Sequence, residues 1–99
     1  MDFRIIKSPS EGTKDILKRR MSISSKADIS NIGAIGLIQG KLIEMIYAAD
    51  IAEKTVGVVV EDIKGNCPQH MILLAILGDI ASVEAAMDEI KLKMKEGKA

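Results

Sequence analysis

The one cysteine and the one histidine of this chain, Cys67 and His70, stand three residues apart in a short polar segment. A thiolate and an imidazole are ligands for soft and borderline metal ions, and a thiolate is also a nucleophile. The segment lies between two apolar runs, and Gly65 and Pro68 inside it are typical of a turn. The pattern therefore predicts two strands joined by a loop that carries both side chains.

Several readings of this pair remain open. Mixed Cys and His ligation suits zinc, but metal sites generally need about four ligands and one chain offers two. Several copies around a common axis would supply the rest. The order Cys67-Pro68-Gln69-His70 also resembles a redox motif whose second cysteine is replaced, but such motifs lie at a helix N-terminus and a strand is expected here. In the plainest reading, Cys67 is a small side chain in a turn and His70 a polar residue at a strand start.

Composition narrows the class of protein. The 99 residues predict one domain whose small core makes oligomerisation an option. Basic and acidic residues number 14 each and aromatics make up 2%, which argues against a nucleic-acid partner. A single cysteine allows no intrachain disulfide, and neither a signal peptide nor a membrane-spanning run is recognisable. We expect a soluble cytoplasmic protein with no membrane partner.

The order of elements predicts an α+β domain. Its four-stranded, mostly antiparallel sheet has helices packed on one face. The first helix is expected to start with Ser8 as N-cap, Pro9 at the first helical position and Glu11 at the third. Gly40 is expected to break the second strand. The expected strands are residues 3–7, 32–38, 56–63 and 71–77; the expected helices are residues 8–21, 41–54 and 80–95; residues 22–31 are expected to be a linker.

The expected helix 41–54 is apolar on several sides. Its main apolar face comprises Leu42, Met45, Ala49 and Ala52, and further apolar residues occupy the rest of its circumference. A helix of this kind needs cover on several sides, which one small sheet cannot supply. The helix or its flanking strands are therefore expected to contact another subunit.

Three motifs in this order resemble bacterial microcompartment (BMC) shell proteins. They are the strand Ala34-Ile35-Gly36-Leu37-Ile38, a helix end at residues 48–54 and a helix start at residues 78–86. These segments resemble the family patterns A-x-G-x-x, A-x-D-x-x-x-K and G-D-x-x-x-V-x-A-A. The strand and short helix expected in residues 1–21 come first here, whereas in the usual family member they come last. This order resembles the circularly permuted branch of the family, with residues 32–95 as its common core.

The resemblance implies a flat cyclic homohexamer that tiles into a shell with other shell proteins and encloses enzymes. Lys54 matches the lysine at the family's hexamer edge, although a plain surface lysine at a helix end is the simpler reading. Ser8 stands where the family often has an arginine. The implied pore loop is longer than the family's usual run of Gly and Ser, and its residues here are Gly65, Asn66, Cys67, Pro68 and Gln69, followed by His70.

The nearest resemblance is to the glycyl-radical-associated, permuted shell proteins, whose pore-loop cysteine is associated with an iron–sulfur cluster. It implies Cys67 as metal ligand, with His70 a less secure second one, and a 4Fe-4S cluster at one per hexamer; zinc is the competitor. No carboxylate pair or phosphate-binding loop indicates an enzyme. The alternative function is a small ferredoxin-like regulatory or ligand-binding module with a zinc or small-molecule site in the hairpin loop.

Overall fold

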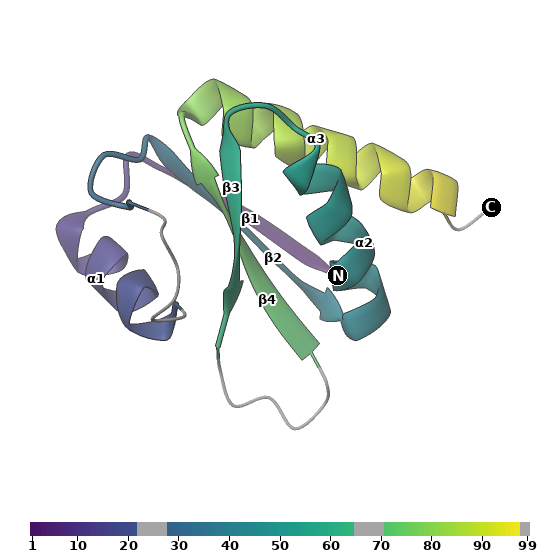
Figure 1. The fold of residues 1–99 in the computed structure, drawn as a ribbon, viewed down its shortest axis with the longest axis horizontal. Coiled ribbons are helices and arrows are strands. Elements are labelled where there is room, and N and C mark those ends of the chain that lie inside the picture. Colours follow the sequence, from purple (N-terminus) through teal and green to yellow (C-terminus); the bar gives the residue numbers. More distant parts are fainter. Residues whose placement is uncertain (22–27, 65–70, 98–99) are drawn as a thin grey trace.

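The computed structural model describes residues 1–21, 28–64 and 71–97, which form four strands and three helices (Figure 1). The predicted α+β class is confirmed. In the described residues, no helix is long and apolar enough to cross a membrane. The elements are β1 (Asp2–Lys7), α1 (Glu11–Arg20), β2 (Ala34–Lys41), α2 (Leu42–Glu53), β3 (Val58–Ile63), β4 (Met71–Gly78) and α3 (Ile80–Gly97).

The strands form one sheet in the order β1-β2-β4-β3, and every neighbouring pair is antiparallel. The two edge strands are therefore β1 and β3. One row of the register runs across the whole sheet, from Phe3 through Ile38 and Leu74 to Asp62. The sheet thus places Phe3 and Asp62 level with one another on opposite edges.

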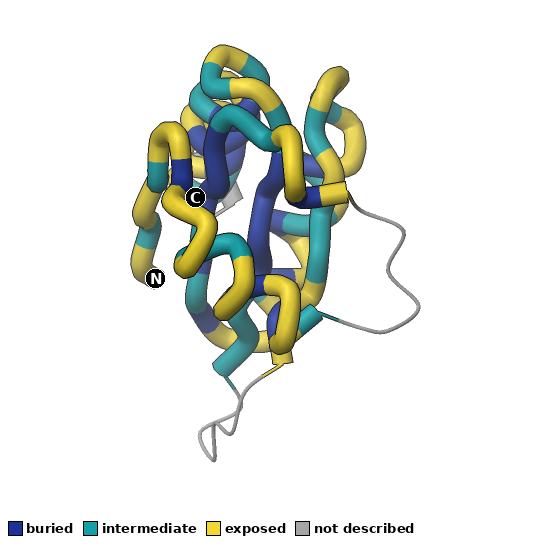
Figure 2. Tube along the Cα trace, turned by 90° about the vertical axis from the view of Figure 1, so that its left-hand side faces the viewer, coloured by how far each residue is buried: buried dark blue, intermediate teal, exposed yellow. Residues whose placement is uncertain are grey.

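The main core lies between the sheet and the pair α2 and α3. At most 1% of the surface of each of four large side chains is exposed there: Ile38, Met45, Met87 and Ile90. Each apolar side chain of this size stabilises the fold by about 1.5–3 kcal/mol when fully buried. Gly36 permits the close approach of α3, since a Cβ at Gly36 would lie 2.8 Å from Met87 Sδ. Figure 2 shows this buried centre between exposed outer segments.

A second apolar cluster covers the opposite face of the sheet, so the expectation of cover on one face only is wrong. Leu17 of α1 and Ile29 pack there against Ile35, Ala75 and Leu77. Ile29 is 6% exposed although it belongs to the segment predicted as a polar linker. The two isoleucines of that segment stand six residues apart among polar residues and form no periodic pattern, so the burial of Ile29 could not be seen in the sequence. The rest of that predicted linker, residues 22–27, lies outside the described residues.

Two predicted boundaries are also wrong. The N-cap of α1 is Ser10, whose Oγ accepts a hydrogen bond from Thr13 N at 3.2 Å. Ser8 instead adopts a positive φ of 49°, and its N–H donates to Gly33 O at 2.8 Å. Gly40 does not break β2, because it remains paired with Ile72 of β4.

Candidate functional site

The hairpin of β3 and β4 frames the predicted ligand loop. Ile63 pairs with Leu73, so the two strand ends that bracket the loop are hydrogen-bonded neighbours (Figure 1). The predicted strand–loop–strand arrangement is confirmed for the two strands. The predicted pore-loop and ligand residues, Gly65, Asn66, Cys67, Pro68, Gln69 and His70, lie outside the described residues, and their roles stay predictions.

The end of β3 next to the ligand loop is hydrogen-bonded to the end of α1, a contact that the sequence did not reveal. The N–H of Lys64 donates to the carbonyl of Arg20 at 3.0 Å, and Arg20 Nη1 donates to the carbonyl of Lys64 at 3.5 Å. The last residue of α1 therefore holds the first residue after β3. These two residues are far apart in the sequence, and both hydrogen bonds are accepted by backbone carbonyls, so they leave no pattern of residue types.

In the part of the chain that the structure describes, no group of three or more His, Cys, Asp or Glu side chains could hold a metal ion. The chain's only thiol and only imidazole are those of Cys67 and His70. One chain thus offers one thiolate, whereas a 4Fe-4S cluster takes four ligands. The donor set fits such a cluster only when several copies of the chain contribute.

The outer side of α2 is unusually apolar. Ile43 and Ile46 are 79% and 63% exposed, and Leu42 and Tyr47 are about half exposed. The buried face consists of Met45, Ala48 and Ala52, so the expectation that Leu42 belongs to it is wrong. Leu42 is the first residue of the helix and is 50% exposed. The prediction that one sheet cannot cover this helix is confirmed.

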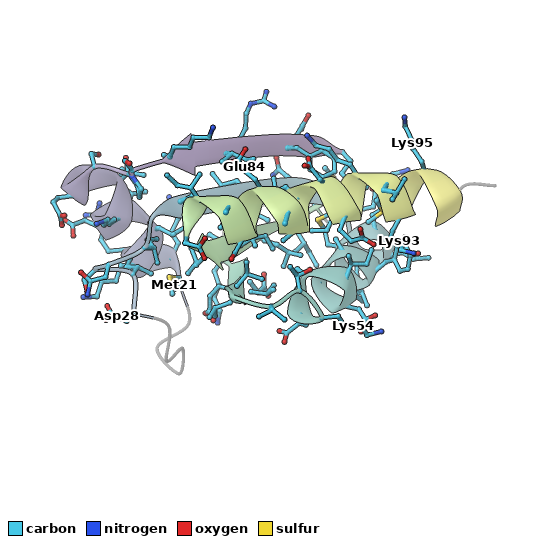
Figure 3. The ribbon with its side chains drawn as sticks, turned by 90° about the horizontal axis from the view of Figure 1, so that it is seen from above. Met21, Asp28, Lys54, Glu84, Lys93 and Lys95 are labelled. Atoms are coloured by element: carbon cyan, nitrogen blue, oxygen red, sulfur yellow. The ribbon has the colours of Figure 1, made fainter. Side chains whose placement is uncertain are left out.

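Lys54 is the C-cap of α2 and is exposed. Its Nζ lies 2.8 Å from Asp50 Oδ2, one helical turn earlier. The hydrogen bond and the charge of Asp50 raise the pKa of Lys54 above its usual 10.5, so the ammonium group persists at neutral pH. Figure 3 shows Lys54 at the surface, on the side of α3 away from β1. Its predicted place at a hexamer edge stays a prediction.

A groove between β1 and α3 was not predicted from the sequence. Lys91 Nζ lies 5.3 Å from the centre of the Phe3 ring, within the range of a cation–π contact. Met1, Met94 and Lys95 complete the lining. Figure 3 shows Lys95 on the side of α3 that faces β1, whereas Lys93 lies toward α2. The two elements stand at opposite ends of the sequence, so no local spacing signals their contact.

Comparisons with known proteins identify the fold. The BMC domain family matches residues 34–99, which is two thirds of the chain. The chain belongs to the BMC domain family. Members of this family that build microcompartment shells are structural proteins and not enzymes. The family fold is an α+β domain with a four-stranded antiparallel sheet and three helices, as observed here.

Two solved structures are similar over nearly the whole chain. One is the ligand-free GrpU microcompartment shell protein from Clostridiales bacterium 1_7_47FAA, at 59% identity and a TM-score of 0.75. The alignment covers 98% of this chain and 95% of that protein. The other is the ligand-free GrpU shell protein from Pectobacterium wasabiae, at 38% identity, a TM-score of 0.74, and coverage of 91% and 99%. The search of curated proteins gave no match.

Proposed function

We propose that this structural protein of the bacterial microcompartment shell closes into a cyclic homohexamer whose central pore holds one iron–sulfur cluster through Cys67. The coarse role, a cytoplasmic shell component that assembles with itself and with other shell proteins, follows from the family and from the likeness to GrpU. The family also decides against the alternative of a ferredoxin-like regulatory module. The hexamer and the cluster are the proposed parts.

The observation that carries the assembly is the exposed apolar side of α2. Leu42, Ile43, Ile46 and Tyr47 are 42–79% exposed and lie within two turns of one helix. An apolar patch of this kind on a small protein marks an interaction surface. A ring uses two different patches on each subunit, one meeting the other in the next copy.

Support for the cluster comes from donor chemistry. Cys67 is the only thiol, and six copies around a pore would bring six thiolates near one axis. Four of them would satisfy a 4Fe-4S cluster, which gives about one cluster per hexamer. A bound cluster of this type supplies one-electron transfer. His70 would ligate or donate a hydrogen bond to a sulfide, and zinc is the competing occupant.

The position of β1 supports the proposed circular permutation. The family match begins at Ala34, and β1, which precedes it in the sequence, completes the sheet beside β2. Phe3 of β1 contacts Lys91 near the end of α3. A short link could therefore join α3 to β1, which is the order expected of the usual family member.

The cluster proposal is tested with Cys67→Ser. Wild type reconstituted with iron and sulfide under anaerobic conditions should turn brown, hold about one cluster per hexamer, and bleach in air. Cys67→Ser should lose the colour and the iron but keep the hexamer mass. His70→Ala should retain part of the iron. Equal iron and sulfide in wild type and Cys67→Ser would refute the cluster, and stoichiometric zinc in wild type would favour the competing metal.

A further inference from the structure

The helix α1 lies against the end of β3 from which the ligand loop starts. Ile63 is the last residue of β3, and Lys64 follows it. We propose that α1 positions the ligand loop by holding Lys64 in place, so that Arg20 and Leu17 are positioning residues for the metal site at Cys67. This inference rests on the proposed cluster and assigns the element that fixes one end of its loop.

The sheet supports the two ends of the ligand loop unequally. After the loop, Met71 begins the central strand β4 and pairs with Lys41 of β2. Before the loop, Ile63 pairs with Leu73 on one side only, and the register of β3 ends there. Because β3 is an edge strand, the backbone groups on its outer side have no strand partner in the described sheet. The start of the loop therefore depends on support from outside the sheet.

Hydrogen bonds from α1 supply part of that support. The N–H of Lys64 donates to the carbonyl of Arg20 at 3.0 Å, an ordinary length for such a bond. Arg20 Nη1 donates to the carbonyl of Lys64 at 3.5 Å, which is long. As the last residue of α1, Arg20 also has one of the carbonyls that a helix leaves unpaired. The backbone bond is therefore the stronger tie, and it satisfies a helix end and a strand end together.

Apolar packing adds a second tie at the same place. Leu17 is the buried residue of α1, and it belongs to the same apolar cluster as Ile63 and Ile29. Leu17 and Ile63 are 7% and 5% exposed. Earlier in the helix, Lys14 Nζ donates to the carbonyl of Ser30 at 3.0 Å. With one buried side chain, α1 is a lightly attached helix, so a single hydrogen bond at its end affects its position.

The position of Lys64 limits where the thiolate can reach. Cys67 follows Lys64 by three residues, and three residues of chain span at most about 11 Å. Several copies must bring their thiolates to one cluster, so a displaced loop start lowers the number that can ligate. Linkage requires the converse as well: a cluster that holds the loops strengthens the attachment of α1.

The main test compares Lys64→Pro with Lys64→Ala. Proline removes the N–H that binds Arg20, whereas alanine keeps it, and Ile63 has the extended conformation that proline favours in the residue before it. Both proteins are reconstituted anaerobically with iron and sulfide and challenged with a chelator. Lys64→Pro should lose its visible absorption at least about threefold faster than Lys64→Ala, a factor within the contribution of one hydrogen bond.

A second set of variants leaves the backbone bond intact. Arg20→Met removes the side-chain donor and should lose the cluster about twofold faster than the matched control Arg19→Met, which has the same charge change at the neighbouring exposed position. Arg20→Lys keeps a charged donor and should restore the slower loss. This rescue identifies the donated hydrogen bond and not the helix alone.

Amide hydrogen exchange measures the coupling in the folded hexamer. In wild type, loading the cluster should slow exchange of the α1 amides at least about twofold relative to the metal-free protein. In Lys64→Pro, loading should leave that exchange unchanged, because the bond that links α1 to the loop is missing. A helix with only a structural role would exchange at one rate with and without the cluster.

The outcomes separate the two proposals. A wild type that binds no cluster overturns the proposed function and this inference together. If wild type holds a cluster and Lys64→Pro loses it no faster than Lys64→Ala, the role of α1 is wrong while the cluster stands. If Lys64→Pro does not fold, the comparison of Arg20→Met with Arg19→Met decides, and equal rates of loss overturn the inference. Faster loss in Arg20→Met with recovery in Arg20→Lys supports it.

Discussion

Gly78, the last residue of β4, lies so close to Gly57 that no side chain larger than a hydrogen atom fits on its Cα. A Cβ built on Gly78 would be 2.5 Å from the carbonyl oxygen of Gly57. The neighbour is backbone and cannot move aside as a flexible side chain would. We expect Gly78→Ala to lower the free energy of unfolding by about 1–3 kcal/mol, since forced overpacking typically costs that much. Urea denaturation measures it.

Gly12 supplies the matched control for this substitution. It lies in the first turn of α1, and a Cβ there would meet no heavy atom within 4 Å. Gly12→Ala is expected to stabilise the fold by up to about 1 kcal/mol, because alanine is the better helix former. If Gly78→Ala and wild type unfolded at the same urea concentration, the tight contact between Gly78 and Gly57 would be refuted.

At the scale of the element, Asp79 makes α3 sensitive to acid. Its Oδ2 accepts a hydrogen bond from Ser82 N at 3.1 Å at the start of the helix. The hydrogen bonds from Ser82 hold the pKa of Asp79 below its usual 3.8. The stabilisation is therefore fully present above the unfolded-state pKa and is lost as the pH falls through the folded-state pKa.

Asp79→Asn tests this dependence, because asparagine keeps the shape and the capping ability but does not ionise. Wild type should be more stable than Asp79→Asn by a constant amount near neutral pH. That advantage should shrink as the pH falls below about 4, near and below the ordinary aspartate pKa. Urea midpoints of both proteins across this range measure it. A difference that is the same at every pH would contradict the role of the ionised carboxylate.

The sequence predicted elements well where the signal was local and periodic. Val83, Met87 and Ile90 recur at helical spacing inside the predicted helix 80–95, and all three are buried. Predictions failed where a residue's state depends on a distant partner. Gly40 continues a strand because β4 pairs with it, and Ile29 is buried because the far face of the sheet needs cover.

The candidate site likewise combines features that local sequence patterns predict with features that depend on distant contacts. The hairpin around the ligand loop was predicted from two apolar runs and a turn, and both strands form, although β3 begins at Val58 and not at residue 56. The excess of apolar residues on α2 was also visible, since helical spacing exposes it. The β1–α3 groove could not be predicted from the sequence, because Phe3 and Lys91 come together only through the sheet order β1-β2-β4-β3.

At the scale of the whole molecule, the domain is a plate of 40 × 33 × 21 Å, and its two proposed assembly sites lie at opposite ends of the sheet. Lys41 pairs with Met71 at the end next to the ligand loop, whereas Gly78 pairs with Val58 at the other. The helix α2 runs from the first end to the second, about 18 Å at 1.5 Å per residue. A loop at the axis therefore puts Lys54 far from it.

From this geometry we predict that Lys54 contacts a neighbouring hexamer and not a neighbouring subunit of its own ring. Lys54→Asp should leave the hexamer mass unchanged, because the side chain is exposed and its one ion pair, with Asp50, contributes little to the fold. The substitution should reduce several-fold the amount of flat hexamer layers seen by electron microscopy. It places a second carboxylate beside Asp50 where neighbouring hexamers would meet. Lys54→Arg keeps the charge and is the control, expected to retain most sheet formation. Sheets as abundant in Lys54→Asp as in wild type would remove Lys54 from the hexamer edge, and loss of the hexamer itself would assign it to the contact between subunits.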